Sequence, residues 1–145
     1  MLLKELFIPE RIVMELKARN KGELFEELSM YLVEKYRLND RGRILQAIRE
    51  REEKFSTGIK EGIAIPHGKT NSVQGVLGIL GISREGIDYD SLDGKPVNLV
   101  FLIVSSDKEA EEHLAVLKKL AILLERTEFS TEVLESKNAK MVSET

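Results

Sequence analysis

Apolar positions in the first third of the chain repeat with the spacing of a helix face. Residues 8–15 are expected to form a short extended segment. Asn20 then begins a predicted helix, with Glu23 three residues later as in a capping box. Its apolar positions are Leu24, Phe25, Leu28, Tyr31 and Leu32. Asp40 is expected to cap a second helix, whose buried stripe is Ile44, Leu45 and Ile48.

The middle of the chain changes to patterns that are typical of loops and strands. Residues 55–70 are expected to form a glycine-punctuated loop around the short apolar run 63–65. Residues 76–82 predict a strand, and Asp93-Gly94 predicts a tight turn. Residues 97–104 are apolar except for Asn98, which is the pattern of a strand buried on both faces.

The last third returns to helical patterns. Ser106 and Glu109 predict another capping box. The helix that follows is expected to bury a seam of Leu114, Leu117, Ala121 and Leu124. Residues 138–145 begin one more helix. Because helices alternate with buried strands, the sequence predicts an α/β fold with one sheet covered by helices, in a single domain spanning residues 1–145.

Composition narrows the classes of function. The chain has 145 residues, of which 42% are apolar and 32% charged, which suits one compact domain with a core. Its net charge of −3 comes without a basic stripe, so nucleic acid is not an expected partner. No apolar run reaches the ~18 residues of a membrane span, and the acidic N-terminal stretch lacks a signal-peptide pattern. We therefore expect a cytoplasmic protein. The absence of cysteine excludes disulfides and thiol chemistry.

His67 is the first candidate for chemistry. It follows Pro66, which fixes the backbone, and precedes Gly68, which would allow a sharp turn. This arrangement presents an imidazole at the edge of a sheet, where it can accept a group covalently and pass it on. The alternative is a loop histidine without a chemical role.

His113 and Arg51 are the other candidates. His113 is spaced 4, 7 and 11 residues from Leu117, Leu120 and Leu124, at the edge of an apolar face. It is either a core-edge histidine with one hydrogen bond or a partner of His67.

Arg51 lies three residues after Ile48, on the inward stripe of its helix. It could form an ion pair with Glu52 or Glu112, or bind a phosphate through two parallel hydrogen bonds. Two histidines with an arginine suit the handling of a phosphoryl group.

Three other site patterns are rejected, so neither a cofactor nor a metal is expected. Residues 62–70 resemble a P-loop, but five residues separate the glycines and Pro66 removes a backbone donor. Asp88, Asp90 and Asp93 resemble a calcium loop, but Leu99 stands where the last ligand should be. A zinc site on the two histidines lacks a third ligand.

The stretch 51–68 (REEKFSTGIKEGIAIPHG) resembles the phosphorylation-site signature of the fructose/mannitol type (type 2) IIA components of sugar phosphotransferase systems. The nitrogen-regulatory IIA proteins belong to the same family. Residues 86–97 are similar to the family's hairpin into its central strand, and His113-Leu114 to its second histidine. Lys60 departs from the signature, which commonly has glycine there, and predicts a less permissive loop.

The resemblance implies a mixed sheet flanked by helices and a phosphohistidine carrier. His67 would be phosphorylated, and His113 and Arg51 would stabilise the phosphoryl group. Ser56, Thr57 and Gly58 would form the loop beside it. The donor would be HPr and the acceptor a IIB component.

The resemblance leaves two alternatives open. One is a regulatory, nitrogen-type IIA protein, in which phosphorylation of His67 switches partner binding. The other is a phosphate-responsive binding module without transfer activity.

Overall fold

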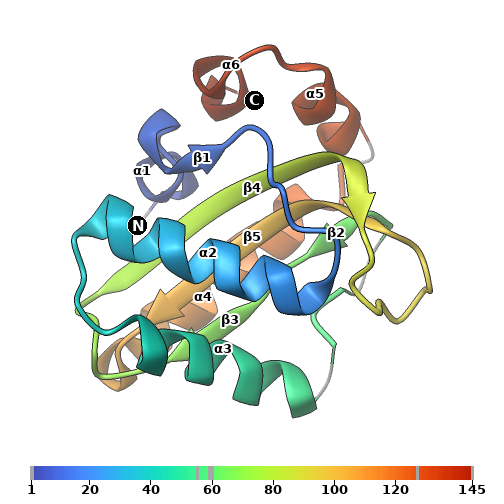
Figure 1. The fold of residues 1–145 in the computed structure, drawn as a ribbon. Helices are drawn as coiled ribbons and strands as arrows, with labels where there is room; N and C mark the ends of the chain where they lie inside the picture. Colours follow the sequence, from blue (N-terminus) through green and yellow to red (C-terminus); the bar gives the residue numbers. More distant parts are fainter. Residues whose placement is uncertain (1, 55, 59–60, 127, 145) are drawn as a thin grey trace.

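The computed structural model describes residues 2–54, 56–58, 61–126 and 128–144. The helices are α1 (Leu3–Leu6), α2 (Lys21–Tyr36), α3 (Arg41–Lys54), α4 (Ala110–Leu123), α5 (Phe129–Glu135) and α6 (Ala139–Glu144). Two short 3-10 helices are η1 (Pro9–Arg11) and η2 (Asp107–Glu109). The strands are β1 (Ile12–Val13), β2 (Ile63–Ala64), β3 (His67–Lys69), β4 (Val76–Ile87) and β5 (Val97–Ser105). Figure 1 shows their arrangement.

The strands form one mixed sheet in the order β1-β4-β5-β2, with β3 also paired to β5. The central pair, β4 and β5, is antiparallel, whereas β1 runs parallel to β4 and both β2 and β3 run parallel to β5. The near-continuous apolar run of β5 is buried along its length, as its sequence pattern predicts.

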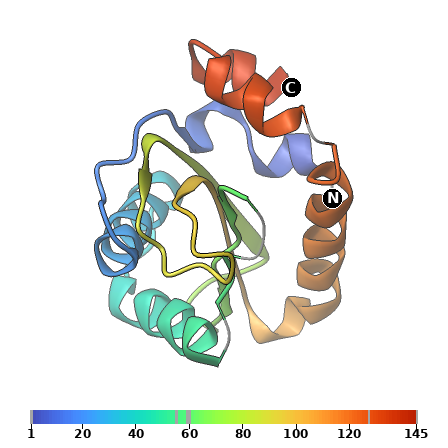
Figure 2. The ribbon, with the colours of Figure 1, turned by 90° about the vertical axis from the view of Figure 1, so that its right-hand side faces the viewer.

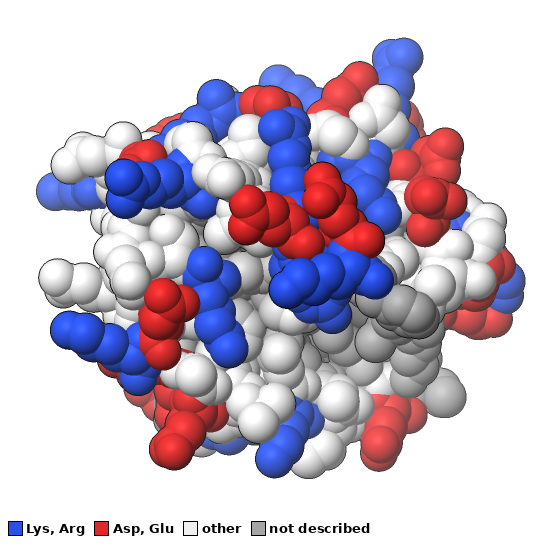
Figure 3. All heavy atoms as spheres, turned by 90° about the horizontal axis from the view of Figure 1, so that it is seen from below, with Lys and Arg blue, Asp and Glu red and all other residues white. Residues whose placement is uncertain are grey.

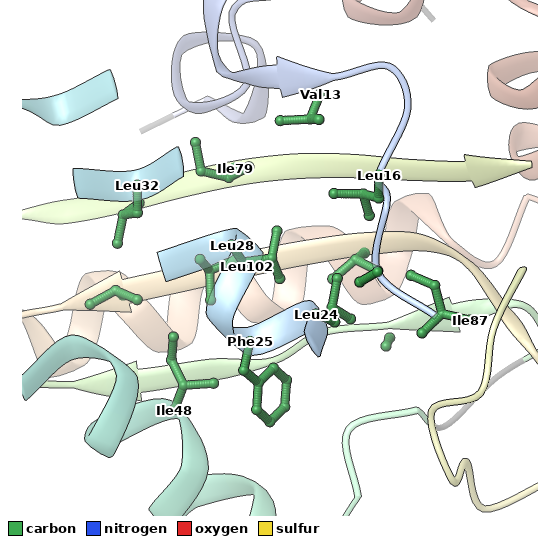
Figure 4. Packing of buried hydrophobic residues seen from close by; sticks show 14 of the residues in the cluster. Val13, Leu16, Leu24, Phe25, Leu28, Leu32, Ile48, Ile79, Ile87 and Leu102 are labelled. Carbon is green, nitrogen blue, oxygen red and sulfur yellow. The ribbon is translucent and has the colours of Figure 1, made fainter. Parts of the chain in front are cut away.

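Helices cover both faces of this sheet, and the predicted α/β fold is confirmed. Figure 2 shows α2 and α3 on one side of the strands and α4 on the other. The face under α2 and α3 holds one apolar cluster, which includes Leu28, Ile48 and Leu102 (Figure 4). The opposite face holds a second cluster, in which Phe101 and Val116 meet residues of α5 and α6. The two clusters fix α3 and α4 on either side of the same strands.

The predicted caps of α2 and α3 form, but the one at α4 does not. Asn20 accepts the backbone N–H of Glu23, and Asp40 accepts that of Arg43. The Glu23 carboxylate accepts from the N–H of Arg19 instead of closing a capping box. The capping box predicted at Ser106 is wrong: its side chain makes no cap hydrogen bond, because the chain first forms the 3-10 turn η2.

The predicted seam of α4 is confirmed in part. Leu124 is buried and Leu117 packs half-buried against the second cluster, but Leu114 is 52% exposed and Ala121 is exposed. The buried positions within α4 are instead His113, Val116 and Leu120. Apolar residues surround much of this helix, so spacing alone does not select the face that packs. The buried face of α4 is therefore rotated relative to the predicted one, and His113 lies within this face and not at its edge.

Three other segments differ from expectation. Part of residues 8–15 forms η1, because Pro9 at the first position favours a helical turn. The loop expected at 55–70 contains β2 and β3. The strand predicted at 76–82 continues through a bulge to Ile87.

Candidate functional site

The edge of the sheet beside β5 positions His67. β2 and β3 keep one register along β5, since Ile63 pairs with Leu99 and His67 with Ile103. Pro66 separates them because it has no N–H to donate, yet its carbonyl still accepts the N–H of Ile103 over 3.1 Å. The result is one edge strand with a proline interruption just before the histidine.

Gly68 has a different role from the one expected. It lies within β3 and makes no sharp turn. A Cβ there would lie 2.9 Å from the carbonyl carbon of Ala47 in α3, so glycine allows the helix to approach the strand closely. Successive residues of a strand point to opposite faces of the sheet. Gly68 faces α3, so the preceding residue, His67, points to the other face. That side is covered by α4.

Both ring nitrogens of His67 have partners. Nδ1 lies 2.8 Å from the carbonyl oxygen of Ile65, and Nε2 lies 3.1 Å from Nε of Arg51. Because the carbonyl can only accept and the guanidinium can only donate, these bonds assign the proton to Nδ1 and the lone pair to Nε2. His67 is thus held as a neutral imidazole with a nucleophilic Nε2.

The surroundings favour this neutral form. Burial lowers the pKa of His67, and the charges of Arg51 and Lys69 lower it further, whereas the bond to Ile65 and the charge of Glu52 oppose the shift. The net pKa lies below its ordinary value. Most of the His67 rings are therefore unprotonated at neutral pH, which a nucleophile requires.

His113 faces His67 from α4. The two ring centroids are 5.4 Å apart, with an interplanar angle of 59°. The His113 ring is 2% exposed and its Nδ1 lies 2.5 Å from Oγ of Ser105. Its Nε2 has no hydrogen-bond partner in the part of the chain that the structure describes. Burial lowers the pKa of His113 to about 4, with the charge of His67 acting in the same direction.

Arg51 lies beside the predicted inward stripe and not on it. The buried positions of α3 are Ile44, Ile48 and Glu52, so the stripe continues to Glu52. Arg51 is half-buried on the flank, where it reaches His67 at the sheet edge. The sequence left open an ion pair between Arg51 and Glu52. In the structure, the Glu52 carboxylate instead contacts Thr57, Tyr89 and Lys21.

The three candidates line one cavity of about 900 Å³. Its wall combines Arg51, His67 and Lys69 with His113, between α3, β3 and the start of α4. Two imidazoles and a guanidinium converge here, and the lining also includes Lys54 and three glutamates, Glu50, Glu53 and Glu111. Such a set offers one nucleophile, hydrogen-bond donors and positive charge to a phosphoryl group.

The predicted loop of Ser56, Thr57 and Gly58 does not line this cavity. Thr57 is buried behind its wall and bonds to Glu52, while Ser56 accepts the N–H of Gly58. The expectation about Lys60 lies outside the described residues.

The face of the molecule that is seen from below the view of Figure 1 carries both signs of charge. Figure 3 shows lysines and arginines interspersed with acids there, without one broad patch of a single sign. Among the described residues, no helix is long and apolar enough to cross a membrane. Within the same residues, no three His, Cys, Asp or Glu side chains gather as a metal site.

Comparison with known proteins identifies the family. Residues 5–145 match the family "Phosphoenolpyruvate-dependent sugar phosphotransferase system, EIIA 2". The chain is 39% identical over 138 residues to the fructose-specific EIIABC component of Bacillus subtilis, matching with 95% of its own length and spanning 22% of that relative.

Solved structures share the fold. The nitrogen regulatory protein IIA-Ntr of Neisseria meningitidis is 30% identical, with a TM-score of 0.90 over 99% of this chain and 98% of that one. The complex of enzyme IIA-Mtl with phosphorylated enzyme IIB-Mtl from Escherichia coli contains a chain with a TM-score of 0.78 and 22% identity, over 93% and 92% of the two chains. On its match over residues 5–145, this chain belongs to the EIIA 2 family of the phosphoenolpyruvate-dependent sugar phosphotransferase system.

Proposed function

We propose that residues 1–145 act as one phosphocarrier domain, in which Nε2 of His67 receives a phosphoryl group from phosphorylated HPr and passes it to a IIB component. The observation that carries the proposal is the unprotonated Nε2 of His67, 3.1 Å from Nε of Arg51 and beside the ring of His113. The same proposal implies a cytoplasmic location.

The proposed transfer takes place between two histidines, the one on HPr and His67. The lone pair on Nε2 of His67 forms the new P–N bond as the P–N bond to the HPr histidine breaks, and the leaving imidazole keeps that electron pair. His67 retains its proton on Nδ1, where the carbonyl of Ile65 stabilises the positive charge that develops on the ring. Little covalent work remains for the protein beyond position and charge.

Arg51 and His113 supply that charge stabilisation. The guanidinium already touches the reacting nitrogen, so a small shift places its donors on the phosphoryl oxygens. When Oγ of Ser105 donates to Nδ1 of His113, the proton of the neutral ring sits on Nε2. This donor, which no described residue engages, is available to the same oxygens. The Ser56–Gly58 loop supports the site from behind.

Labelled phosphoenolpyruvate with enzyme I and HPr tests the proposal. The wild-type chain should acquire acid-labile label, and His67→Ala should acquire none. The chain has two histidines, so His113→Gln serves as the comparison that retains the proposed acceptor. Matching melting temperatures show that the variants are folded. Undiminished label on His67→Ala would overturn the assignment.

A regulatory role is the second candidate, and the likeness to IIA-Ntr over nearly the whole of both chains favours it. The phosphorylated protein separates the two when it is mixed with a IIB component. Passage of the label to IIB supports transport. Retention of the label, together with altered binding to a target protein, supports the regulatory role. A chain that responds to phosphate but never carries label would be a binding module.

A further inference from the structure

We infer that Glu52 is a positioning residue for His67, acting through a relay of hydrogen bonds that runs from Glu52 to Thr57, then to Ile65, and then to Nδ1 of His67. The inference rests on the proposed function for its effect on phosphoryl transfer, but the geometry of the relay is independent of it. Sequence patterns assigned Glu52 only a possible ion pair with Arg51.

The first link is a buried carboxylate that is fully engaged. Glu52 is 7% exposed, although it belongs to a residue type that is rarely buried unless paired. Its Oε2 accepts the backbone N–H of Thr57 over 2.9 Å, and its Oε1 accepts the Thr57 hydroxyl over 2.6 Å. Thr57 is thereby held at both its backbone and its side chain.

Two further groups bond to this carboxylate. Nζ of Lys21, at the start of α2, lies 2.9 Å from Oε2, and the hydroxyl of Tyr89 lies 3.1 Å from Oε1. Burial raises the pKa of Glu52, but the bonds from Thr57 and Lys21 outweigh burial and the pKa lies below its ordinary value. Burial also raises the pKa of Tyr89, so the phenol keeps its proton and can donate it.

The second and third links lead to the reacting ring. The carbonyl of Thr57 accepts the N–H of Ile65 over 3.1 Å, and the carbonyl of Ile65 accepts Nδ1–H of His67 over 2.8 Å. Each link fixes the position of the next residue. The Ile65 carbonyl accepts the proton on Nδ1, so the relay acts together with the Arg51 donor to leave the lone pair on Nε2.

The relay also supports the charge of the reaction. The Glu52 carboxylate raises the pKa of His67, against the larger lowering by burial. It thereby offsets part of the cost of positive charge on the ring when the P–N bond forms. The same α3 turn carries Arg51, so the carboxylate anchors the loop on one side of the site while its neighbour contacts Nε2.

The test compares Glu52→Gln with Glu27→Gln. Glu27 is a matched control, because its carboxylate also accepts backbone N–H groups, those of Lys17 and Ala18, yet has no bond toward His67. Nitrogen-15 NMR of the His67 ring in the unphosphorylated protein reports its tautomer and pKa. Labelled phosphoenolpyruvate with enzyme I and HPr reports the rate at which label is accepted.

Glu52→Gln should reduce the fraction of Nδ1–H tautomer, lower the pKa of His67 and slow acceptance of label roughly 10-fold. Glu27→Gln should leave all three at wild-type values. The relay is refuted when Glu52→Gln matches Glu27→Gln in ring state or in rate. A wild-type chain that accepts no label refutes the proposed function instead, and the ring measurements still decide the relay.

A second variant covers the case in which Glu52→Gln does not fold. Tyr89→Phe removes the hydroxyl that contacts both Glu52 and Thr57 but keeps the edge-on ring contact with Phe25. It should change the His67 tautomer in the same direction by a smaller amount. Wild-type ring state and rate in a folded Tyr89→Phe protein would then count against the relay.

Discussion

Acid should destabilise this fold through His113, and replacing His113 with asparagine should remove that part of the loss. The unfolded histidine has a pKa of about 6.5, whereas burial lowers the pKa of His113 in the folded chain to about 4. Between these values the unfolded chain binds a proton that the folded chain does not. The contribution of His113 to stability is therefore complete above pH 6.5 and decreases as the pH falls toward 4.

The two pKa values give the size of the effect. Lowering the pH from 7 to 5 should cost about 2 kcal/mol of unfolding free energy through His113 alone, as the linkage relation gives for these values. His113→Asn keeps a polar atom near the position of Nδ1, where Ser105 bonds, but cannot ionise. His67 and the carboxylates titrate in both proteins, so the difference between the two pH dependences isolates His113.

Urea unfolding, followed by circular dichroism at pH 7, 6 and 5, measures both dependences. The stability of the asparagine variant at pH 7 need not equal that of the wild type, since only the change with pH is compared. Its loss between pH 7 and pH 5 should be smaller than that of the wild type by about 2 kcal/mol. Equal losses in the two proteins would show that the native His113 ring accepts a proton as easily as an unfolded one, and the reasoning from its burial would be refuted.

Four further substitutions probe the site. Arg51→Ala should slow phosphoryl transfer by roughly 10- to 150-fold, the range for a charge-assisted hydrogen bond, with little change in melting temperature; a large thermal loss with a normal rate in the folded protein would make it a structural residue. His113→Ala should slow transfer to His67 within a similar range, and His113→Gln less, because its amide can replace the Nε2 donor; wild-type rates for both would leave His113 without this role. Gly68→Ala should lower the melting temperature, since its Cβ would meet the Ala47 backbone; an unchanged melting curve would contradict that contact.

The fold was largely predictable, because hydrophobic spacing reports which side of an element is buried. The β5 run identified a central strand, and Asn20 and Asp40 marked the starts of two helices. The phase of α4 was not predictable in this way. Apolar residues occupy positions on several sides of that helix, and the shape of the sheet selects the side with Val116 over the side with Leu114.

The residues of the candidate site were predictable from the sequence where their type is rare, and not predictable where their type is common. His67 and His113 are the two histidines of the chain, and the structure brings their rings together. Glu52 is one acid among many on a charged helix. Its spacing of four residues after Ile48 was the available signal, but glutamate is normally exposed. Its partners Lys21 and Tyr89 are far away in sequence, so the sequence gives no local sign of the compensation that burial requires.

In the proposed transfer, the position of Arg51 resolves a conflict between two demands on His67. A nucleophile must be unprotonated, and a positive neighbour helps because it disfavours a second positive charge on the ring. A phosphorylated ring carries negative oxygens, and the same neighbour then attracts them. The sign of the interaction therefore reverses along the reaction without a change in the protein's own charge. The guanidinium already contacts Nε2 in the unphosphorylated protein, so the proposed transfer needs little reorganisation of this group. Arg51→Ala should thus raise the pKa of His67 while it slows transfer, a combination that loss of folding alone would not produce.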